Sequence, residues 1–241
     1  MLMQRFYPES RFGGFSAVDG TVAFYSRVQA LLRPESVLID FGCGRGAYGD
    51  DPLPFRRALR IFKGRAAHVI GLDAGPAGAN NPFLDAFHQL QPGAPWPLAD
   101  NCADLIVCDN VLEHLPRPDE FFSEAWRVLR PGGMLCIRTP NRWNYIAVLS
   151  QLIPNRQHAR VLAKAKVGLR EEDIFPTFYR CNSLPAVRSA LKRHQFTAHV
   201  YGYEAEPSYL SFSALAYAMG VLHQKLAPGI LRAAIFAFAQ K

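Results

Sequence analysis

Three alternating glycines directly follow an apolar run in the first quarter of the chain. The run Val37–Phe41 is typical of a buried parallel strand, and it leads into Gly42, Gly44 and Gly46. Because glycine has no side chain, a ligand can lie directly against the backbone of such a turn. Asp40 stands near the end of the strand, where its carboxylate would face the same ligand. The pattern predicts a site for a nucleotide-like cofactor and leaves its identity open.

A second apolar run, His68–Asp73, also ends in a carboxylate. A glycine turn followed by an acidic second strand fits two cofactors, a dinucleotide or S-adenosylmethionine. The dinucleotide fingerprint places its third glycine where this chain has Ala47, a difference that the fingerprint tolerates. Asp40 discriminates better, because a carboxylate repels a pyrophosphate and suits the ammonium of an amino acid. The residues therefore favour S-adenosylmethionine, and a nicotinamide-dependent oxidoreductase is the disfavoured alternative.

Five motifs, in order over residues 37–139, resemble those of the class I S-adenosylmethionine-dependent methyltransferases, in particular the small-molecule, methyltransferase type 11-like group. They are Asp40-x-Gly42-x-Gly44-x-Gly46, Asp73, Pro97–Leu105, Val111–Leu115 and Arg127–Gly133. The resemblance implies an α/β fold with a doubly wound, Rossmann-like sheet of seven strands, mostly parallel with an antiparallel last strand, and helices on both faces. It also implies S-adenosyl-L-methionine as cofactor and methyl transfer to an O, N or C atom of a small molecule, with glycan and lipid precursors among the candidates. The alternative is a methyltransferase-like domain that binds without catalysing.

The resemblance also assigns roles to residues at the strand ends. Asp73 would accept hydrogen bonds from both ribose hydroxyls. The methionine part of the cofactor would be bordered by Asp40, Gly42, Cys43, Gly44 and Gly46, and the amino-acid moiety and transferable methyl by Asp109 and Asn110. The chain departs from the family in two places. A long gap before Asp73 predicts an insertion within 48–66, and residues 88–93 hold no acid for the adenine, whose contacts stay unassigned.

The chemistry of methyl transfer requires alignment of the acceptor with the methyl group, and a hydroxyl acceptor also needs a base. His114 follows the predicted fourth strand and is the candidate base. The alternative is a structural role, in which His114 closes the site by hydrogen bonding. His158 and Tyr179 are less favoured candidates for the base.

Acceptor choice in this family depends on the segment after the fifth strand and on the N-terminal region. The candidate substrate residues are Asn141, Arg142, Tyr179 and Arg180. Arginines interleaved with aromatic residues suit an acidic or glycosylated acceptor. Alternatively, the aromatic side chains pack within the segment and the arginines are solvated.

Alternating strand and helix patterns must position these residues. Asp19 is the predicted N-cap of a helix that Pro34 stops, and a helix over 119–129 separates strands over 104–109 and 134–139. Residues 87–90 predict a short strand, and 196–204, 210–226 and 235–239 predict a strand, a helix and a last strand. We expect a single methyltransferase domain over 1–241, with an N-terminal cap and helix (1–33), a cofactor-binding core (34–139), a substrate-side insertion (140–194) and the last strands and helix (195–241).

Composition limits the partners. The formal charge of +7 is either scattered over the surface or favours acidic substrates, nucleic acid or anionic lipid, and no run of like charges indicates a nucleic-acid tail. The apolar stretch 209–239, with Lys225 and Arg232, predicts a core helix and strand rather than a membrane-surface segment. Five cysteines without metal or disulfide spacing, and no leader or spanning segment, predict a cytoplasmic protein without a bound metal.

Overall fold

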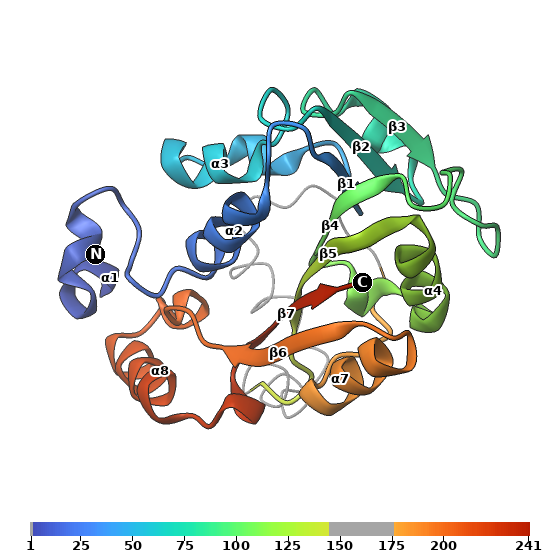
Figure 1. The fold of residues 1–241 in the computed structure, drawn as a ribbon. Coiled ribbons are helices and arrows are strands. Elements are labelled where there is room, and N and C mark those ends of the chain that lie inside the picture. The colour runs from blue at the N-terminus through green and yellow to red at the C-terminus, as the bar shows by residue number, and fades with distance from the viewer. Residues whose placement is uncertain (1, 145–175) are drawn as a thin grey trace.

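The computed structural model describes residues 2–144 and 176–241, which form a seven-stranded sheet with the order β3-β2-β1-β4-β5-β7-β6 (Figure 1). β7 is antiparallel to both of its neighbours, and the other strands are parallel to one another. The predicted doubly wound sheet with an antiparallel last strand is confirmed. The strands are β1 (Val37–Phe41), β2 (His68–Asp73), β3 (Ala86–Gln89), β4 (Ala103–Asp109), β5 (Leu129–Pro140), β6 (Thr197–Tyr203) and β7 (Ala234–Gln240).

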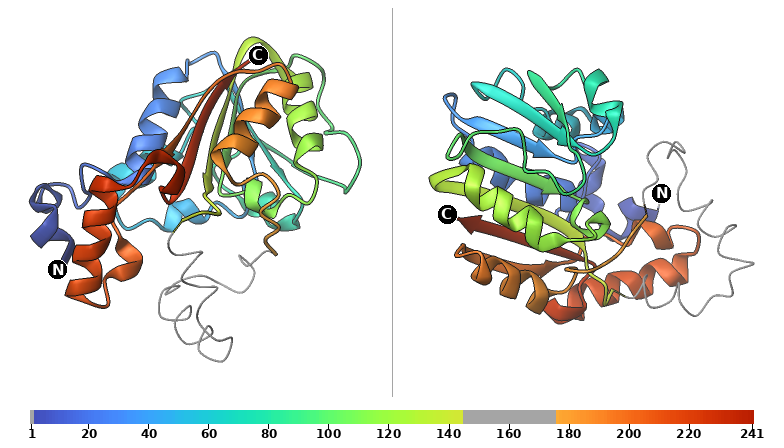
Figure 2. Two further views of the ribbon diagram at one scale, coloured as in Figure 1. Left: turned by 90° about the horizontal axis from the view of Figure 1, so that it is seen from below. Right: turned by 90° about the vertical axis from the view of Figure 1, so that its right-hand side faces the viewer.

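Helices cover both faces of the sheet, with α2 and α3 on one face and α4 and α7 on the other (Figure 2). Phe24 and Val28 of α2 pack against the first face, and Phe122 of α4 and Val187 of α7 pack against the second. Each face therefore has its own apolar core, and the central strands are buried between them. The helices are α1 (Leu2–Phe6), α2 (Gly20–Leu31), α3 (Pro54–Arg60), α4 (Pro118–Val128), α7 (Leu184–Arg193) and α8 (Ala214–Leu226).

Local signals in the sequence explain where the helices begin. The carboxylate of Asp19 accepts hydrogen bonds from the backbone N–H groups of Thr21 and Val22, so the predicted N-cap of α2 is confirmed. α4 begins at Pro118, whose missing N–H is not needed in the first turn, and Ser183 caps α7. These signals fix the helix starts at the edge of the sheet where the parallel strands end.

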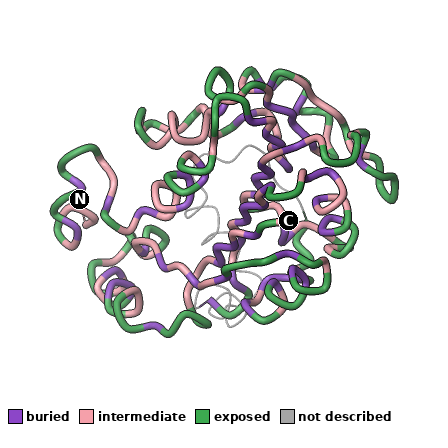
Figure 3. The backbone as a smooth tube through the Cα atoms, in the orientation of Figure 1, coloured by how far each residue is buried: buried purple, intermediate pink, exposed green. Residues whose placement is uncertain are grey.

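The predicted helix and strand of 209–239 both form, but the helix is not a core helix. β7 is buried at Ile235, Phe236 and Ala237. α8 buries only one face, on which the Tyr217 ring packs 5.3 Å from that of Phe6 in α1. The remaining face of α8 is exposed (Figure 3). Within the described ranges, no helix is both long enough and apolar enough to cross a bilayer.

Candidate functional site

The carboxyl ends of β1, β2 and β4 bring three predicted site residues to one edge of the sheet. Asp40, Asp73 and Asp109 stand at or next to the last residues of these neighbouring parallel strands. In open α/β sheets, ligands bind in the crevice at this edge. The topology therefore brings together acids that lie up to about seventy residues apart in the sequence.

The glycine turn after β1 has a conformation that requires glycine. Gly42, Gly44 and Gly46 all have positive φ angles, of 75°, 48° and 78°. A Cβ atom on Gly42 would lie 2.2 Å from Cγ2 of Val111, and one on Gly46 would lie 2.6 Å from Oδ1 of Asn81. A Cβ atom on Gly44 would meet nothing within 4 Å. The turn is thus packed on two sides and open at Gly44.

Hydrogen bonds from neighbouring loops hold this turn. One carboxylate oxygen of Asp73 accepts from the backbone N–H of Gly44 at 2.9 Å, and the other accepts from Gly75 at 2.8 Å. The amide of Asn81 donates to the carbonyl oxygens of Cys43 and Gly44, each at 3.2 Å. Cys43 itself is buried.

Asp40 has an unusual protonation equilibrium. Burial, together with the nearby carboxylates of Asp109 and Asp73, raises its pKa to about 7, and Arg60 and Tyr48 oppose this shift. The Tyr48 hydroxyl donates to the Asp40 carboxylate at 3.4 Å. Asp40 therefore gains or loses a proton near neutral pH, and a cation placed beside it would favour the ionised form.

Arg60 is a site residue that the sequence did not single out. Its guanidinium lies 3.7 Å from the Asp109 carboxylate and over the rings of Tyr25 and Tyr48, at 5.5 Å and 5.1 Å from their centroids. Its Nε atom is buried and has no hydrogen-bond partner among the described residues. A buried donor without a partner is rare in proteins, and it marks a place where an acceptor can bind. The only signal in the sequence is the basic stretch 56–63 beside the glycine turn.

Asp109 is held inside the protein by an ion pair. Arg138 donates to both of its oxygens, at 2.5 Å and 2.6 Å, and the Tyr25 hydroxyl donates at 2.8 Å. Burial alone would raise the pKa of Asp109, but Arg138 keeps it below its ordinary value. A further Arg138 N–H donates to the hydroxyl of Thr21, which joins α2 to β5. Asn110 follows in a left-handed conformation with φ 55° and is exposed. Of this predicted pair, Asn110 is thus the more accessible to a ligand.

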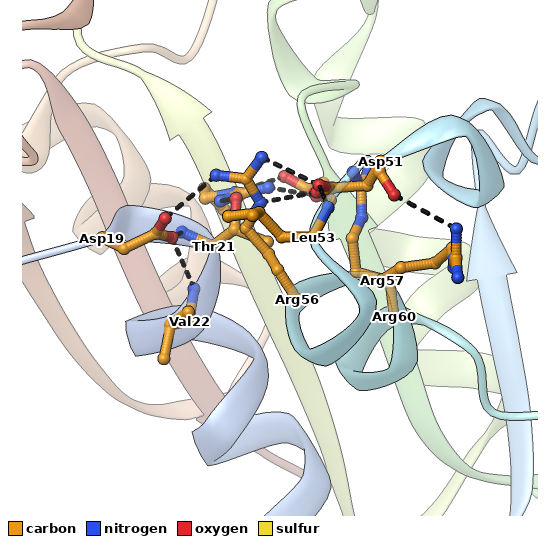
Figure 4. A network of polar contacts seen from close by, with 10 residues as sticks. Asp19, Thr21, Val22, Asp51, Leu53, Arg56, Arg57 and Arg60 are labelled. Atoms are coloured by element: carbon orange, nitrogen blue, oxygen red, sulfur yellow. Dashed lines mark hydrogen bonds and ion pairs between the residues drawn. The ribbon is translucent and has the colours of Figure 1, made fainter. Parts of the chain in front are cut away.

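A second polar network lies beside the glycine turn and ties α2 to α3 (Figure 4). Arg56 donates to Asp19 at 3.0 Å and to Asp51 at 2.5 Å and 2.9 Å. Although burial opposes it, hydrogen bonds from Arg56 and Leu53 lower the pKa of Asp51. The segment 48–66, predicted to contain an insertion, therefore folds as a short helix that links the N-terminal region to the site.

His114 and Glu113 hold the chain that returns to the sheet after residue 175. Nδ1 of His114 lies 2.9 Å from the carbonyl oxygen of Pro176, so this nitrogen carries the hydrogen in that bond. The buried carboxylate of Glu113 accepts from the Thr139 hydroxyl at 2.9 Å, and Asn182 donates to the same hydroxyl oxygen at 2.6 Å. Burial raises the pKa of Glu113. The geometry agrees with the structural alternative for His114, and a role as base stays a prediction.

The predicted substrate residues differ in how accessible they are to a ligand. Asn141 is buried, and its amide donates to two backbone carbonyls, those of Ile230 and Arg232. Arg142 is exposed and stacks over Trp143, with its Cζ atom 5.3 Å from the ring centroid. Asn141 thus stabilises the end of β5, and Arg142 is accessible.

Tyr179 and Arg180 lie beyond the undescribed segment. The backbone N–H of Tyr179 donates to the carbonyl of Glu113 at 3.1 Å, which places Tyr179 beside the motif of His114. Arg180 lines a cavity of about 700 Å³ between the start of α4 and α7. The backbone N–H of Arg142 donates to the carbonyl of Asn182 at 2.8 Å, so the two ends of this region meet. His158, another candidate base, lies outside the described residues.

The site is suited to an organic ligand with both an amino and a carboxylate group. Asp40 offers a carboxylate to an ammonium, Arg60 offers an N–H to a carboxylate, and Gly44 offers open backbone. Within 2–144 and 176–241, no group of three or more His, Cys, Asp or Glu side chains could hold a metal ion.

Known methyltransferases are similar to this chain in sequence and in fold. The profile of a family described as a methyltransferase domain matches residues 39–137. The chain is similar to a probable S-adenosylmethionine-dependent methyltransferase of Mycolicibacterium smegmatis, with 38% identity over 110 residues that cover 44% of this chain and 38% of the relative. The chain therefore spans well under half of that relative's length.

Solved structures share the fold at low sequence identity. A methyltransferase from Archaeoglobus fulgidus aligns over 97% of both chains with a TM-score of 0.56 and 16% identity. The cyclase SpnF aligns over 91% of this chain and 80% of its own, with a TM-score of 0.54 and 17% identity. Likeness at this level shows the fold, and the fold alone does not fix the reaction.

Proposed function

We propose that this protein is a class I S-adenosylmethionine-dependent methyltransferase that transfers the methyl group of S-adenosylmethionine to a small-molecule acceptor. The match of residues 39–137 to the methyltransferase-domain profile supports this proposal. One observation carries the proposal. The open backbone of Gly44 lies at the strand edge that also holds a carboxylate, Asp40, and a buried guanidinium N–H without a partner, on Arg60.

The side chains of the site fit the chemistry of the cofactor. Its methionine part carries an ammonium, for which Asp40 is the acceptor, and a carboxylate, for which Nε of Arg60 is the free donor. Asp73 uses one lone pair of each carboxylate oxygen on Gly44 and Gly75, which leaves acceptor capacity for the ribose hydroxyls. We assign the methionine part to Asp40, Arg60 and the turn, and the ribose to Asp73.

S-adenosylmethionine supplies, when bound, a methyl group on a sulfonium that an acceptor atom can attack in line. The residues of this chain would align the acceptor with the methyl group and exclude water, and would form no covalent bond to either. The bonds from Glu113 and His114 hold the backbone at Tyr179 and Pro176 close to the end of β4. Tyr179 would then border the acceptor, Asn110 would face the reacting groups, and His114 would position this wall of the site.

We further propose an acceptor that carries negative charge or many hydroxyl groups, such as a glycan or lipid precursor. The support is the exposed Arg142 and the cavity beside Arg180, because arginine forks recognise phosphate and carboxylate groups. Asn141 is not part of this proposal, since its amide is fully used within the chain.

The experiment measures binding of S-adenosylhomocysteine by calorimetry to the wild type and to Asp73→Ala, Arg60→Met and the control Asp100→Ala. Asp100 is an exposed acid away from the turn. We expect each site variant to weaken binding about tenfold or more and the control to bind like the wild type. A folded Asp73→Ala protein with undiminished binding would overturn the cofactor assignment. Product formation from radiolabelled S-adenosylmethionine and fractionated cell extracts then separates an enzyme from a domain that only binds.

A further inference from the structure

The exposed apolar side chains of this protein are concentrated in one short region. Of the thirteen large hydrophobic side chains that are exposed in the described residues, eight lie between residues 209 and 231. So many exposed apolar side chains within one stretch of chain mark a candidate interaction surface. The eight are Tyr209, Phe212, Leu215, Met219, Leu222, Leu226, Ile230 and Leu231, and we call this surface the α8 patch.

The centre of the α8 patch is a stripe along one face of the helix. Leu215, Met219, Leu222 and Leu226 follow a spacing of four, three and four residues, which places them on one side of α8. They are 73%, 65%, 58% and 72% exposed. The opposite side of the helix is buried against α1. α8 therefore presents apolar residues on both its inner and its outer face.

The stretch of chain that carries the α8 patch holds no acid. Residues 207–241 contain no Asp or Glu, and Lys225 lies within the helix. The two nearest acids in the sequence are turned inward, since Glu204 accepts from the backbone N–H of Ala233 and Glu206 accepts from the Ser16 hydroxyl. α1, which packs on α8, also holds no acid and carries Arg5. An exposed apolar stripe on a helix that carries Lys225 and no acid matches an anionic lipid surface.

A second copy of the chain fits this surface less well. A two-fold interface through the α8 patch would face the same residues of both copies, and these carry positive charge only. The formal charge of +7 for the whole chain adds to the repulsion between copies and to the attraction for anionic lipid.

We propose that the α8 patch docks this protein on the surface of a membrane that contains anionic phospholipid. α8 follows β6, and β6 ends at the same edge of the sheet as β1 and β4. The docked helix would therefore hold the edge with the glycine turn close to the bilayer.

Vesicle flotation tests the proposal with the full chain. The probes are vesicles of phosphatidylcholine alone and vesicles with roughly one third phosphatidylglycerol. We expect the wild type to float with the anionic vesicles, and Leu222→Glu/Leu226→Glu to bind them about tenfold or more weakly. Lys225→Glu removes a positive charge and no apolar side chain. It should weaken binding to the anionic vesicles and make that binding less sensitive to salt. Leu31→Glu is the matched control. Leu31 is an exposed leucine at the end of α2. Because α2 precedes β1, Leu31 lies at the edge of the sheet opposite to that of α8.

Circular dichroism of each variant shows whether it is folded, and sedimentation velocity without lipid gives its oligomeric state. Flotation of the wild type and of Leu31→Glu, with loss in the two α8 variants, supports the proposal. A wild type that stays with the soluble fraction overturns it, as does equal flotation of Leu222→Glu/Leu226→Glu. A stable wild-type dimer that this double variant dissociates, without flotation, would assign the patch to a second copy instead.

Discussion

Arg138 and Asp109 occupy register positions opposite each other on β5 and β4, and their side chains form a bidentate ion pair at the carboxyl edge of the sheet. The pair is nearly closed to solvent, with 11% of the Arg138 side chain and 7% of the Asp109 side chain exposed. Because Arg138 also donates to the hydroxyl of Thr21 in α2, the pair belongs both to the fold and to the candidate site.

Removing one partner of this pair should strongly destabilise the protein. We expect Arg138→Met to lower the free energy of unfolding by about 3–5 kcal/mol, because Asp109 would stay buried without its main counter-ion. Urea unfolding followed by circular dichroism measures the change. Arg117→Met is the control, since it removes an exposed pair with Glu120 and should cost about 1 kcal/mol or less. An equal loss of unfolding free energy in the two variants would show that the buried pair stabilises the fold no more than an exposed one.

Cofactor binding should strengthen as pH rises from 6 to 8. The pKa of Asp40 is raised to about 7, so the carboxyl is largely protonated at pH 6 and ionised at pH 8, where it attracts the ammonium of the ligand. Calorimetry with S-adenosylhomocysteine should therefore show proton release near pH 6.5 and an affinity that rises about tenfold across this range. In Asp40→Asn, binding should be weaker and this pH dependence should disappear. A wild-type affinity that stays constant between pH 6 and 8 would contradict the prediction.

Asp40 should also make the stability of the ligand-free fold fall as pH rises, whereas cofactor affinity rises. Because the folded protein holds the Asp40 proton more tightly than the unfolded chain does, Asp40 stabilises the fold below pH 4 and loses this contribution as pH rises through 7. Asp40→Asn should therefore become more stable relative to the wild type between pH 5 and 8. Thermal unfolding of both proteins without ligand measures the difference, and a constant difference would argue against the raised pKa.

Two glycines of one turn should respond differently to alanine. Gly44→Ala costs the fold about 1–2 kcal/mol for the left-handed conformation, but its new methyl group points into open space. We expect this variant to fold and to bind S-adenosylhomocysteine about tenfold or more weakly. Gly42→Ala forces a methyl group against Val111 and should lower the melting temperature much further. Thermal shifts with and without ligand separate the two effects, and full ligand stabilisation of Gly44→Ala would place the ligand elsewhere.

The role of His114 can be divided into proton transfer and positioning. The amide nitrogen of an asparagine can replace Nδ1 in the bond to Pro176 but cannot act as a base. If His114 positions the wall, His114→Asn should keep most of the methyl transfer activity and His114→Ala should lose about tenfold. The pH profile of kcat in His114→Asn is the second measurement. Equal, complete loss in both variants would identify His114 as the base.

The fold could be predicted from the sequence because its signals are local. Apolar runs ending in acids gave β1, β2 and β4, and the cap at Asp19 gave the start of α2. The helix at 214–226 was correctly located, but its burial was predicted wrongly. Apolar periodicity alone does not say whether a partner covers a helix, and for the outer face of α8 none of the described residues does.

The site was predictable only where residues lie on the motif itself. Asp40, Asp73 and Asp109 reach one edge because parallel strands place them there. Arg60 and Tyr25 could not be found in this way, since their place in the site comes from helices that pack across the sheet. Arg138 did leave a signal, because a charge inside the apolar strand 134–139 needs a buried partner. Asn141 is a candidate of the opposite kind. It lies after the fifth strand as expected, but its side-chain amide donates only to backbone carbonyls of this chain.

The backbone hydrogen bond from Arg142 to Asn182 also affects which parts of the sequence can change. With the bonds of Asn182 to Thr139 and Pro140, it fastens together the two ends of the chain that runs between them. β5 pairs with β4 and β7 before the chain reaches Arg142. Doubling the number of residues between two fixed points costs only about 0.6 kcal/mol in closure entropy. The two anchors, Arg142 and Asn182, therefore allow the sequence between them to change without loss of the strand pairing of β5.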